Sequence, residues 1–239
     1  MVATYVGYRW LYYYGDNVFV NQIERWDAHV MTFQRHDEAK IIPQHRERRK
    51  RLLAAAAAAI AERGFEGVRL RDVAAECGVT TGMLQYYFAS REKLLHAAFE
   101  HAALDQVAGW RKAISGKPVR GERLQVLLDH MVEEFSSPNT CSIWTELCAT
   151  ASRHHDLRPL VSHVFGEWHA IIREVVDDAT ADGAIRPAVP VDDAIRILVA
   201  AFDGYELDLA SSSGSTNPAS ASQQIMQLAD LLFPRIRRG

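Results

Sequence analysis

The sequence predicts an all-α fold of about nine helices. Apolar residues recur at the three-to-four-residue spacing of amphipathic helices from residue 44 onward. No later segment alternates apolar and polar residues as a half-buried strand would, and clusters of glycine, proline and serine divide the chain at helix-length intervals. The chain has 239 residues, 48% of them hydrophobic, which is enough to bury a sizeable core.

The segment 1–43 differs from the rest of the chain. Aromatic residues crowd its first half, which has strand-like local propensity and no helical period. Two interpretations are open: an extension that packs on the body or adds a contact, or upstream DNA translated from a wrongly chosen start, with Met31 as the true beginning. We favour the second because every recognisable pattern begins after residue 43. A peptide containing Tyr12 to Tyr14 in the native protein would exclude it.

Three helices are expected between residues 44 and 92. The first covers 45–67, where alanines give high helix propensity and Gly64 can supply a left-handed stop. A short helix over 71–76, a turn at Gly78 and a third helix over 80–88 follow. The apolar positions of the first helix share one face: Leu52, Leu53, Ala56, Ala59 and Ile60.

Six further helices are expected after this segment. Ser90 can cap the first of them, and the glycine and proline of 116–118 end it. The polar run 211–222 is expected to be a flexible connector before the last helix. The six helices cover 90–115, 120–135, 140–153, 156–181, 192–209 and 223–233.

Charge is unevenly distributed along the chain. The net charge of -3 favours no class of partner, but residues 46–93 hold ten basic and six acidic side chains, so this segment carries +4 and the remainder -7. A basic block on an otherwise acidic chain is the pattern of a polyanion-binding segment, although a solvated face gives the same count.

The three cysteines indicate a reducing compartment. Cys77, Cys141 and Cys148 lie among apolar neighbours without metal-ligand spacing, which favours reduced, buried thiols. No apolar run has membrane-spanning length, and the first residues lack the layout of a secretion signal. We therefore expect a cytoplasmic protein that contacts no membrane.

The segment 70–89 has the pattern of a helix-turn-helix. Such a unit needs a small residue where its helices cross, a turn residue that tolerates positive φ, and an apolar anchor in its second helix. The small residue is Ala74, the turn residue is Gly78, and the apolar anchor is Leu84. Four more residues complete the expected small core: Val73, Cys77, Val79 and Phe88.

With Leu84 and Phe88 facing inward, the opposite side of the helix 80–88 is expected to face DNA. Gln85 can form paired hydrogen bonds with an adenine edge, and Gly82 lets the backbone approach closely. Of the two adjacent tyrosines, one is expected to be partly buried. The expected base-facing residues are Thr81, Gly82, Met83, Gln85 and Tyr86, and the expected phosphate contacts are Arg69, Thr80, Tyr87 and Arg91.

Residues 46–95 resemble the DNA-binding domain of TetR-type transcriptional regulators. The matching stretches are "ERGFEG", "RDVAAECGV", "TTGMLQYYF" and "SREKLL". The stretches 142–176 and 197–210 are similar to the C-terminal domain of the betaine-responsive branch. Members commonly carry Ser or Thr where Val68 and Arg69 stand, so a helix cap is lost here, and Arg69 either supplies the phosphate contact or is an ordinary surface residue.

The resemblance implies a homodimeric regulator, by family habit a repressor, that binds a palindromic operator in double-stranded DNA. It implies a three-helix helix-turn-helix domain over 44–92 and a helical effector-binding and dimerisation domain over 93–239. Apolar stripes on the last two helices are the expected dimer contact, although such stripes are more often core. The stripe residues are Ile195, Leu198, Val199, Phe202, Ile225, Leu228 and Leu232.

The central helices are expected to enclose a pocket for a small, largely apolar effector, whose identity the sequence does not reveal. The candidate lining residues are large and mostly apolar: Phe99, Trp110, Met131, Phe135, Trp144, Phe165, Trp168 and His169.

Two other functions compete with this interpretation. An enzyme would have to use the histidines, because no nucleophile elbow, phosphate loop or paired-carboxylate motif is present. His154 and His155 are adjacent and point apart on a helix, so placement at a helix end or in solvent explains them better, and we expect no catalytic residue, metal or cofactor. A helical adaptor with a degenerate helix-turn-helix would show no salt-dependent affinity for DNA.

Overall fold

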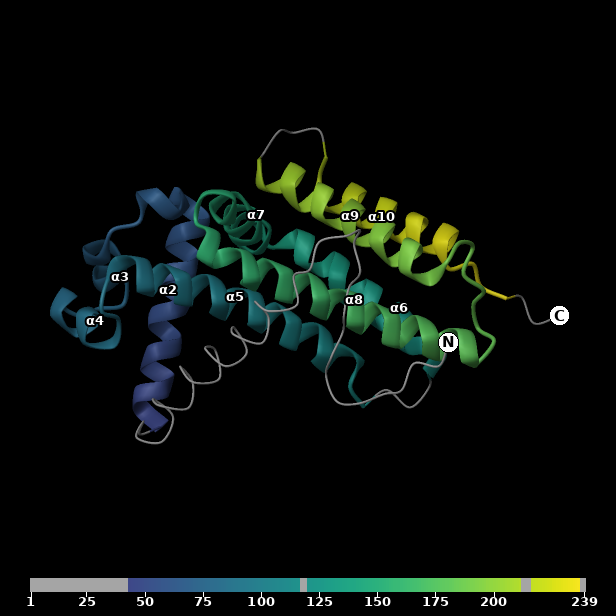
Figure 1. Ribbon diagram of the computed structural model, residues 1–239, viewed down its shortest axis with the longest axis horizontal. Coiled ribbons are helices and arrows are strands. Elements are labelled where there is room, and N and C mark those ends of the chain that lie inside the picture. Colours follow the sequence, from purple (N-terminus) through teal and green to yellow (C-terminus); the bar gives the residue numbers. More distant parts are fainter. Residues whose placement is uncertain (1–42, 117–119, 212–215, 237–239) are drawn as a thin grey trace, which may run out of the picture. The chain divides into compact units, whose positions relative to one another are not determined.

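The computed structural model describes residues 43–116, 120–211 and 216–236 (Figure 1). The segment 1–42, to which the two interpretations of the N-terminus apply, lies outside these ranges. In the described ranges the chain forms nine α-helices and two short 3-10 helices, which confirms the all-α prediction. None of the helices in these ranges has the length and apolar character needed to cross a bilayer. The described residues from 47 onward form one compact unit.

Three helices precede the central part of this unit. They are α2 (Pro43–Gly67), α3 (Leu70–Glu76) and α4 (Thr81–Tyr87). Gly64 has a φ of 70°, the left-handed conformation expected of it, and kinks the end of α2. Gly78 makes the turn between α3 and α4 with a φ of 63°. The predicted core is confirmed for Val73, Ala74, Leu84 and Phe88, which are buried, whereas Cys77 and Val79 are half-buried.

The remaining helices form a bundle in which α6 packs on α5, α8 and α10, while α9 packs on α7, α8 and α10 (Figure 1). Their bounds are α5 (Arg91–Ile114), α6 (Arg120–Glu133), α7 (Pro138–Arg153), α8 (Arg158–Ala181), α9 (Val191–Ala210) and α10 (Pro218–Leu232). The 3-10 helices η1 (Glu134–Ser136) and η2 (His155–Leu157) follow α6 and α7. Because α5 begins at Arg91, the predicted domain boundary at 92/93 falls in its first turn; the division into domains stays a prediction.

The last helix begins earlier than predicted. The sequence pattern placed 218–222 in a flexible connector, but α10 starts at Pro218. Asn217 is its N-cap, and the Asn217 side chain accepts a hydrogen bond of 3.0 Å from the backbone N–H of Ser220. A capping Asn followed by Pro at the first helical position is a start signal, which explains the difference.

The structure corrects the predicted dimer stripe. Six of its residues are buried within a single chain and Leu228 is half-buried, because α9 and α10 turn these faces toward the bundle core. The six buried residues therefore stabilise the fold of one chain and leave little surface for the expected contact between two chains. The buried six are Ile195, Leu198, Val199, Phe202, Ile225 and Leu232.

Candidate nucleic-acid interface and buried acidic cluster

Helix α4 presents a polar and aromatic face to solvent. Leu84 is fully buried and Phe88 is 4% exposed, so these two residues fix the rotation of the helix. The hydroxyl of Thr80 caps the helix by accepting a hydrogen bond of 3.1 Å from the Met83 N–H. This hydroxyl keeps its own proton to donate. The residues expected to face DNA bases are all exposed: Thr81, Gly82, Met83, Gln85 and Tyr86.

The two adjacent tyrosines have different environments. The Tyr86 side chain is largely solvent-exposed, with 78% of its surface accessible, whereas Tyr87 is half-buried. Their rings meet edge to face, with centroids 5.5 Å apart. At Gly82 an added Cβ would meet only Thr80 Oγ1, at 3.9 Å, so packing within the chain does not require glycine. This open space is consistent with a close approach of the backbone to a ligand outside the protein.

Arg91 is bound to the main chain of the segment that joins α2 to α3. Its Nε donates a hydrogen bond of 2.7 Å to the Val68 carbonyl, and another of its nitrogens donates to the Phe65 carbonyl. The guanidinium also lies over the Phe65 ring, 5.2 Å from its centroid. Arg91 therefore fastens the start of α5 to the end of α2. Its predicted phosphate contact stays a prediction, as does that of Arg69, which is exposed and gives α3 no side-chain cap.

A second hydrogen bond ties α2 to the bundle. The Glu146 side chain on α7 accepts a bond of 2.7 Å from the Phe65 N–H, directly after the kink at Gly64. A Cβ at position 64 would lie 3.4 Å from the Glu146 carboxylate. The end of α2 is thus held by α5 on one side and α7 on the other.

The predicted pocket residues divide into two groups. Trp110 stacks on Trp168 with centroids 5.2 Å apart, Trp144 lies 4.7 Å from Trp168, and the Phe135 ring stacks on Phe202 at 4.8 Å. Phe165 joins this aromatic group through Trp144, at 5.4 Å. Phe99 is stacked on Phe65 at the end of α2, and it lines a small cavity together with Trp144. Met131 is buried and His169 half-buried.

One buried and two half-buried carboxyl groups lie near this aromatic group, and sequence reasoning missed all three. Glu134, in η1, accepts hydrogen bonds from Gln106 and from the Trp110 indole, the latter at 2.7 Å. Asp203, on α9, accepts one of 3.1 Å from the Trp144 indole. Glu206, one turn later, is fully buried, and no donor in the described ranges reaches either of its carboxylate oxygens. We call Glu134, Asp203 and Glu206, with Trp110, Trp144, Trp168 and Phe202, the acidic cluster.

Burial raises the pKa of all three carboxyl groups. It raises the pKa of Glu134 to about 7, against the opposing effect of the hydrogen bonds from Gln106 and Trp110. Burial likewise raises the pKa of Asp203 to about 6. The pKa of Glu206 lies well above its usual value because of burial first and the charges of Glu134 and Asp203 second. Because ionised carboxyl groups near one another repel, a cation placed among the three would offset both the burial and the repulsion.

The acidic cluster is closed in this structure. The adjoining cavity measures about 20 Å³ and is lined by residues that include Phe99, Gln106, Thr140 and Trp144. Such a volume holds about one water molecule. A larger ligand would need the surrounding side chains to move apart. A sequence signal for the cluster does exist: Glu206 falls four and seven residues after Phe202 and Val199, on the apolar stripe of α9.

Comparisons with known proteins match both parts of the chain. The family model described as bacterial regulatory proteins, tetR family, matches residues 52–98, and the model of the BetI-type transcriptional repressor C-terminal domain matches residues 120–234. The chain is similar to the transcriptional regulator BetI of Burkholderia thailandensis, with 26% identity over 78% of this chain and 93% of that protein. The regulator PksA of Bacillus subtilis is 29% identical over 47% of this chain and 56% of its own length.

Solved structures share the fold. A TetR-family regulator from Rhodococcus sp. aligns with a TM-score of 0.64 and 27% identity, over 78% of this chain and 98% of that one. A putative transcriptional regulator from Saccharomonospora viridis, solved in complex with choline, aligns with a TM-score of 0.69 and 20% identity, over 80% of this chain and 99% of that one.

Proposed function

This chain belongs to the TetR family of bacterial regulators and has a BetI-type C-terminal domain, and we propose that it is a repressor that a small organic cation releases from its operator. DNA-binding transcriptional regulation is the function of the family, and the similarity to regulators across both parts of the chain disfavours the helical adaptor. The proposal adds the class of effector and the residues that bind DNA.

The exposed face of α4 supports direct reading of the major groove. Gln85 would form paired hydrogen bonds with adenine, while Met83 and the methyl group of Thr81 would contact thymine methyl groups. Thr80 would donate its hydroxyl proton to a phosphate, since its oxygen already caps the helix. Exposure of Tyr86 rather than Tyr87 makes Tyr86 the tyrosine that would reach the bases.

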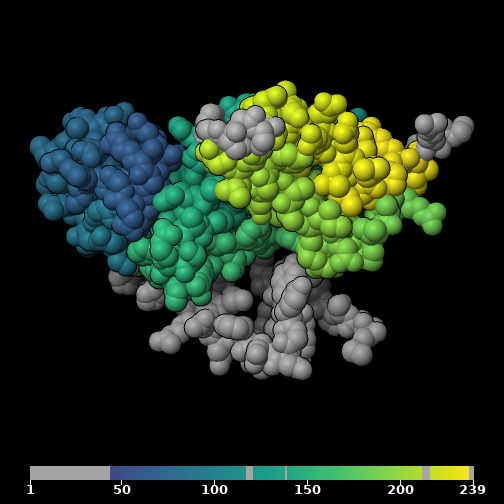
Figure 2. All heavy atoms as spheres, turned by 90° about the horizontal axis from the view of Figure 1, so that it is seen from above, coloured from purple at the N-terminus to yellow at the C-terminus, as the bar shows by residue number. Residues whose placement is uncertain are grey.

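The outward face of α9 and α10 supports a homodimer. The two helices lie next to each other at the surface, yellow-green and yellow in Figure 2. Three large apolar side chains are exposed on them: Ile197, Leu207 and Leu231, the last at 72%. Exposed apolar side chains on neighbouring helices favour burial against a second copy. A two-fold dimer would present two α4 helices to successive major grooves, about 34 Å apart or more.

Glu206 is the observation that carries the proposed effector class. A fully buried carboxyl with no donor to satisfy it is costly for the fold, and two more carboxyls lie nearby. Indole rings attract cations through their faces, and Trp110, Trp144 and Trp168 belong to the same cluster. A quaternary ammonium group with an apolar surface fits both features. The sequence pattern predicted a largely apolar effector; the three carboxyls favour a cation instead.

Choline is the probe that tests this proposal. Purified protein would be titrated with choline by calorimetry, and its affinity for DNA fragments that it selects from genomic DNA would be measured by fluorescence anisotropy with and without choline. We expect choline to bind and to weaken DNA binding. The Glu206→Gln variant should keep its affinity for DNA and lose the response to choline, because glutamine keeps the shape without the charge.

Glu122→Gln is the matched control, since Glu122 is an exposed glutamate on α6. It should respond to choline as the unmodified protein does. An equal response of the Glu206→Gln variant would refute the assigned site, and absence of salt-dependent DNA binding would favour the adaptor. Circular dichroism of both variants separates loss of the ligand site from loss of the fold.

A further inference from the structure

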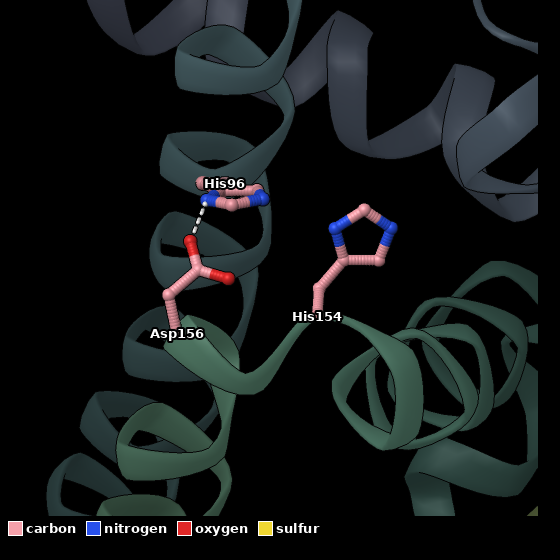
Figure 3. Close-up of side chains that lie close together, drawn as sticks. All are labelled: His96, His154 and Asp156. Carbon is pink, nitrogen blue, oxygen red and sulfur yellow. Dashed lines mark ion pairs between the residues drawn. The ribbon is translucent and has the colours of Figure 1, made fainter.

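Two imidazoles and a carboxylate meet where α5 passes the connection between α7 and α8 (Figure 3). His96 projects from α5, His154 follows the last residue of α7, and Asp156 lies in η2. One possible ligand atom from each side chain lies within 4.8 Å of the other two. The sequence pattern considered the stretch 152–156 and the histidines after it as a possible metal site and predicted no metal, because it could not place His96 beside them.

The donor set is that of a first-row divalent metal. Zinc prefers imidazole nitrogen and carboxylate oxygen at about 2.0–2.2 Å, which separates the ligand atoms of a tetrahedral site by about 3.4 Å. His96 Nδ1 and Asp156 Oδ2 are already 3.1 Å apart. His154 would need to approach by up to about 1.4 Å to reach this separation. The Glu66 carboxylate is a candidate fourth ligand, since Glu66 Oε1 lies 3.7 Å from His154 Nε2.

An ordinary ion pair leaves part of this arrangement unexplained. The ion pair joins His96 Nδ1 to Asp156 alone. It does not account for the second imidazole, whose ring centroid lies 6.2 Å from that of His96. Two carboxylates, from Asp156 and Glu66, match the charge of a divalent cation.

We propose that His96, His154 and Asp156 bind one zinc ion or a similar divalent transition metal per chain, with Glu66 as the fourth ligand. The site lies against the end of α2, where the Phe65 ring is 5.0 Å from His154 and 5.8 Å from His96 between centroids. A bound metal would join α5 to the connection between α7 and α8. The site is separate from the acidic cluster, so it goes beyond the proposed response to an organic cation.

The test uses untagged protein freed of metal with EDTA and titrated with zinc chloride by calorimetry, without DNA or choline. We expect one zinc per chain and a rise in melting temperature. The Asp156→Asn and His154→Gln variants should bind zinc at least about tenfold more weakly and lose the rise in melting temperature. Asp156 has 65% of its side chain exposed, so its substitution tests the site without disturbing the core.

His155→Gln is the matched control, because His155 is exposed, adjacent in sequence and outside the cluster. It should bind zinc as the unmodified protein does. The proposal is overturned by a protein that binds no stoichiometric zinc, or by a His155→Gln variant that loses as much affinity as His154→Gln. Cobalt(II) titration gives an independent readout, since tetrahedral coordination by these ligands produces visible absorption that Asp156→Asn should lack.

Discussion

The affinity of the chain for choline should increase about twentyfold between pH 6 and pH 8. The perturbation is pH alone, because a quaternary ammonium group carries its charge at every pH and does not titrate. The protein titrates instead: the carboxyls of the acidic cluster are protonated at low pH, and a cation binds their ionised form. Binding of the cation therefore releases protons, and binding tightens as pH rises.

The magnitude follows from Glu134, whose pKa burial raises to about 7. At pH 6 about one molecule in eleven has this carboxyl ionised, and at pH 8 about ten in eleven, so the binding-competent fraction grows about tenfold. Asp203, with a pKa of about 6, adds about a factor of two over the same range. The raised pKa of Glu206 acts in the same direction.

Calorimetry at pH 6, 7 and 8, at constant ionic strength, measures this dependence. Repeating the titration in two buffers of different ionisation enthalpy counts the protons released. The Glu134→Gln variant should lose most of the slope, while the exposed Glu122→Gln variant should keep it. A choline affinity that stays level or falls from pH 6 to pH 8 would refute the reasoning, because it would show that no cluster carboxyl has to ionise for binding.

Three further predictions concern reading of DNA, stability and assembly. Gln85→Ala should cost about 1–3 kcal/mol on the preferred operator and relax specificity at one base pair, whereas Arg91→Ala should weaken binding to all sequences; competition with single-base operator variants measures both. Because the folded-state pKa of Glu134 is raised from 4.5 to about 7, the stability that its neutral form contributes is complete below pH 4.5 and is lost as pH rises to about 7. Glu134→Gln should remove this fall of up to about 3 kcal/mol in urea unfolding. Leu231→Glu should shift the dimer to monomer in analytical ultracentrifugation, whereas Phe202→Ala should lower the unfolding free energy by about 3–5 kcal/mol, because Phe202 is core and not interface.

Helical periodicity was sufficient to predict the fold because it depends on local sequence. The left-handed glycines mark the kink at the end of α2 (Gly64) and the turn before α4 (Gly78). Leu84 with Phe88 sets the rotation of α4, so its exposed face could be predicted from two anchors. The same two anchors do not show which of Tyr86 and Tyr87 is exposed to solvent. Which of these leaves the core depends on packing against residues outside α4, and only the structure shows it.

Long-range partners explain most of what sequence reasoning missed. The phosphate contact of Arg91 stays a prediction, but sequence reasoning missed its two carbonyl partners, 23 and 26 residues away, because no local pattern marks a carbonyl as an acceptor. The sequence of an apolar stripe likewise does not show whether the stripe packs against its own chain or against a second copy. This is why Phe202 and its neighbours were assigned to the dimer contact, although they form the core.

Helix α7 connects the two proposed ligand sites to the end of α2. Its Trp144 donates to Asp203 in the acidic cluster, and its Glu146 accepts from the Phe65 N–H at 2.7 Å. Residues two apart on a helix point in different directions, so one rigid element contacts the effector site on one side and α2 on the other. A cation that draws Asp203 away from Trp144 would act on α7, and a shift of α7 would act on the bond between Glu146 and the Phe65 N–H. His154 ends the same helix, so a metal there would restrain the motion that the cation requires. Zinc and choline should therefore oppose each other's binding by equal factors, since coupling between two sites is reciprocal.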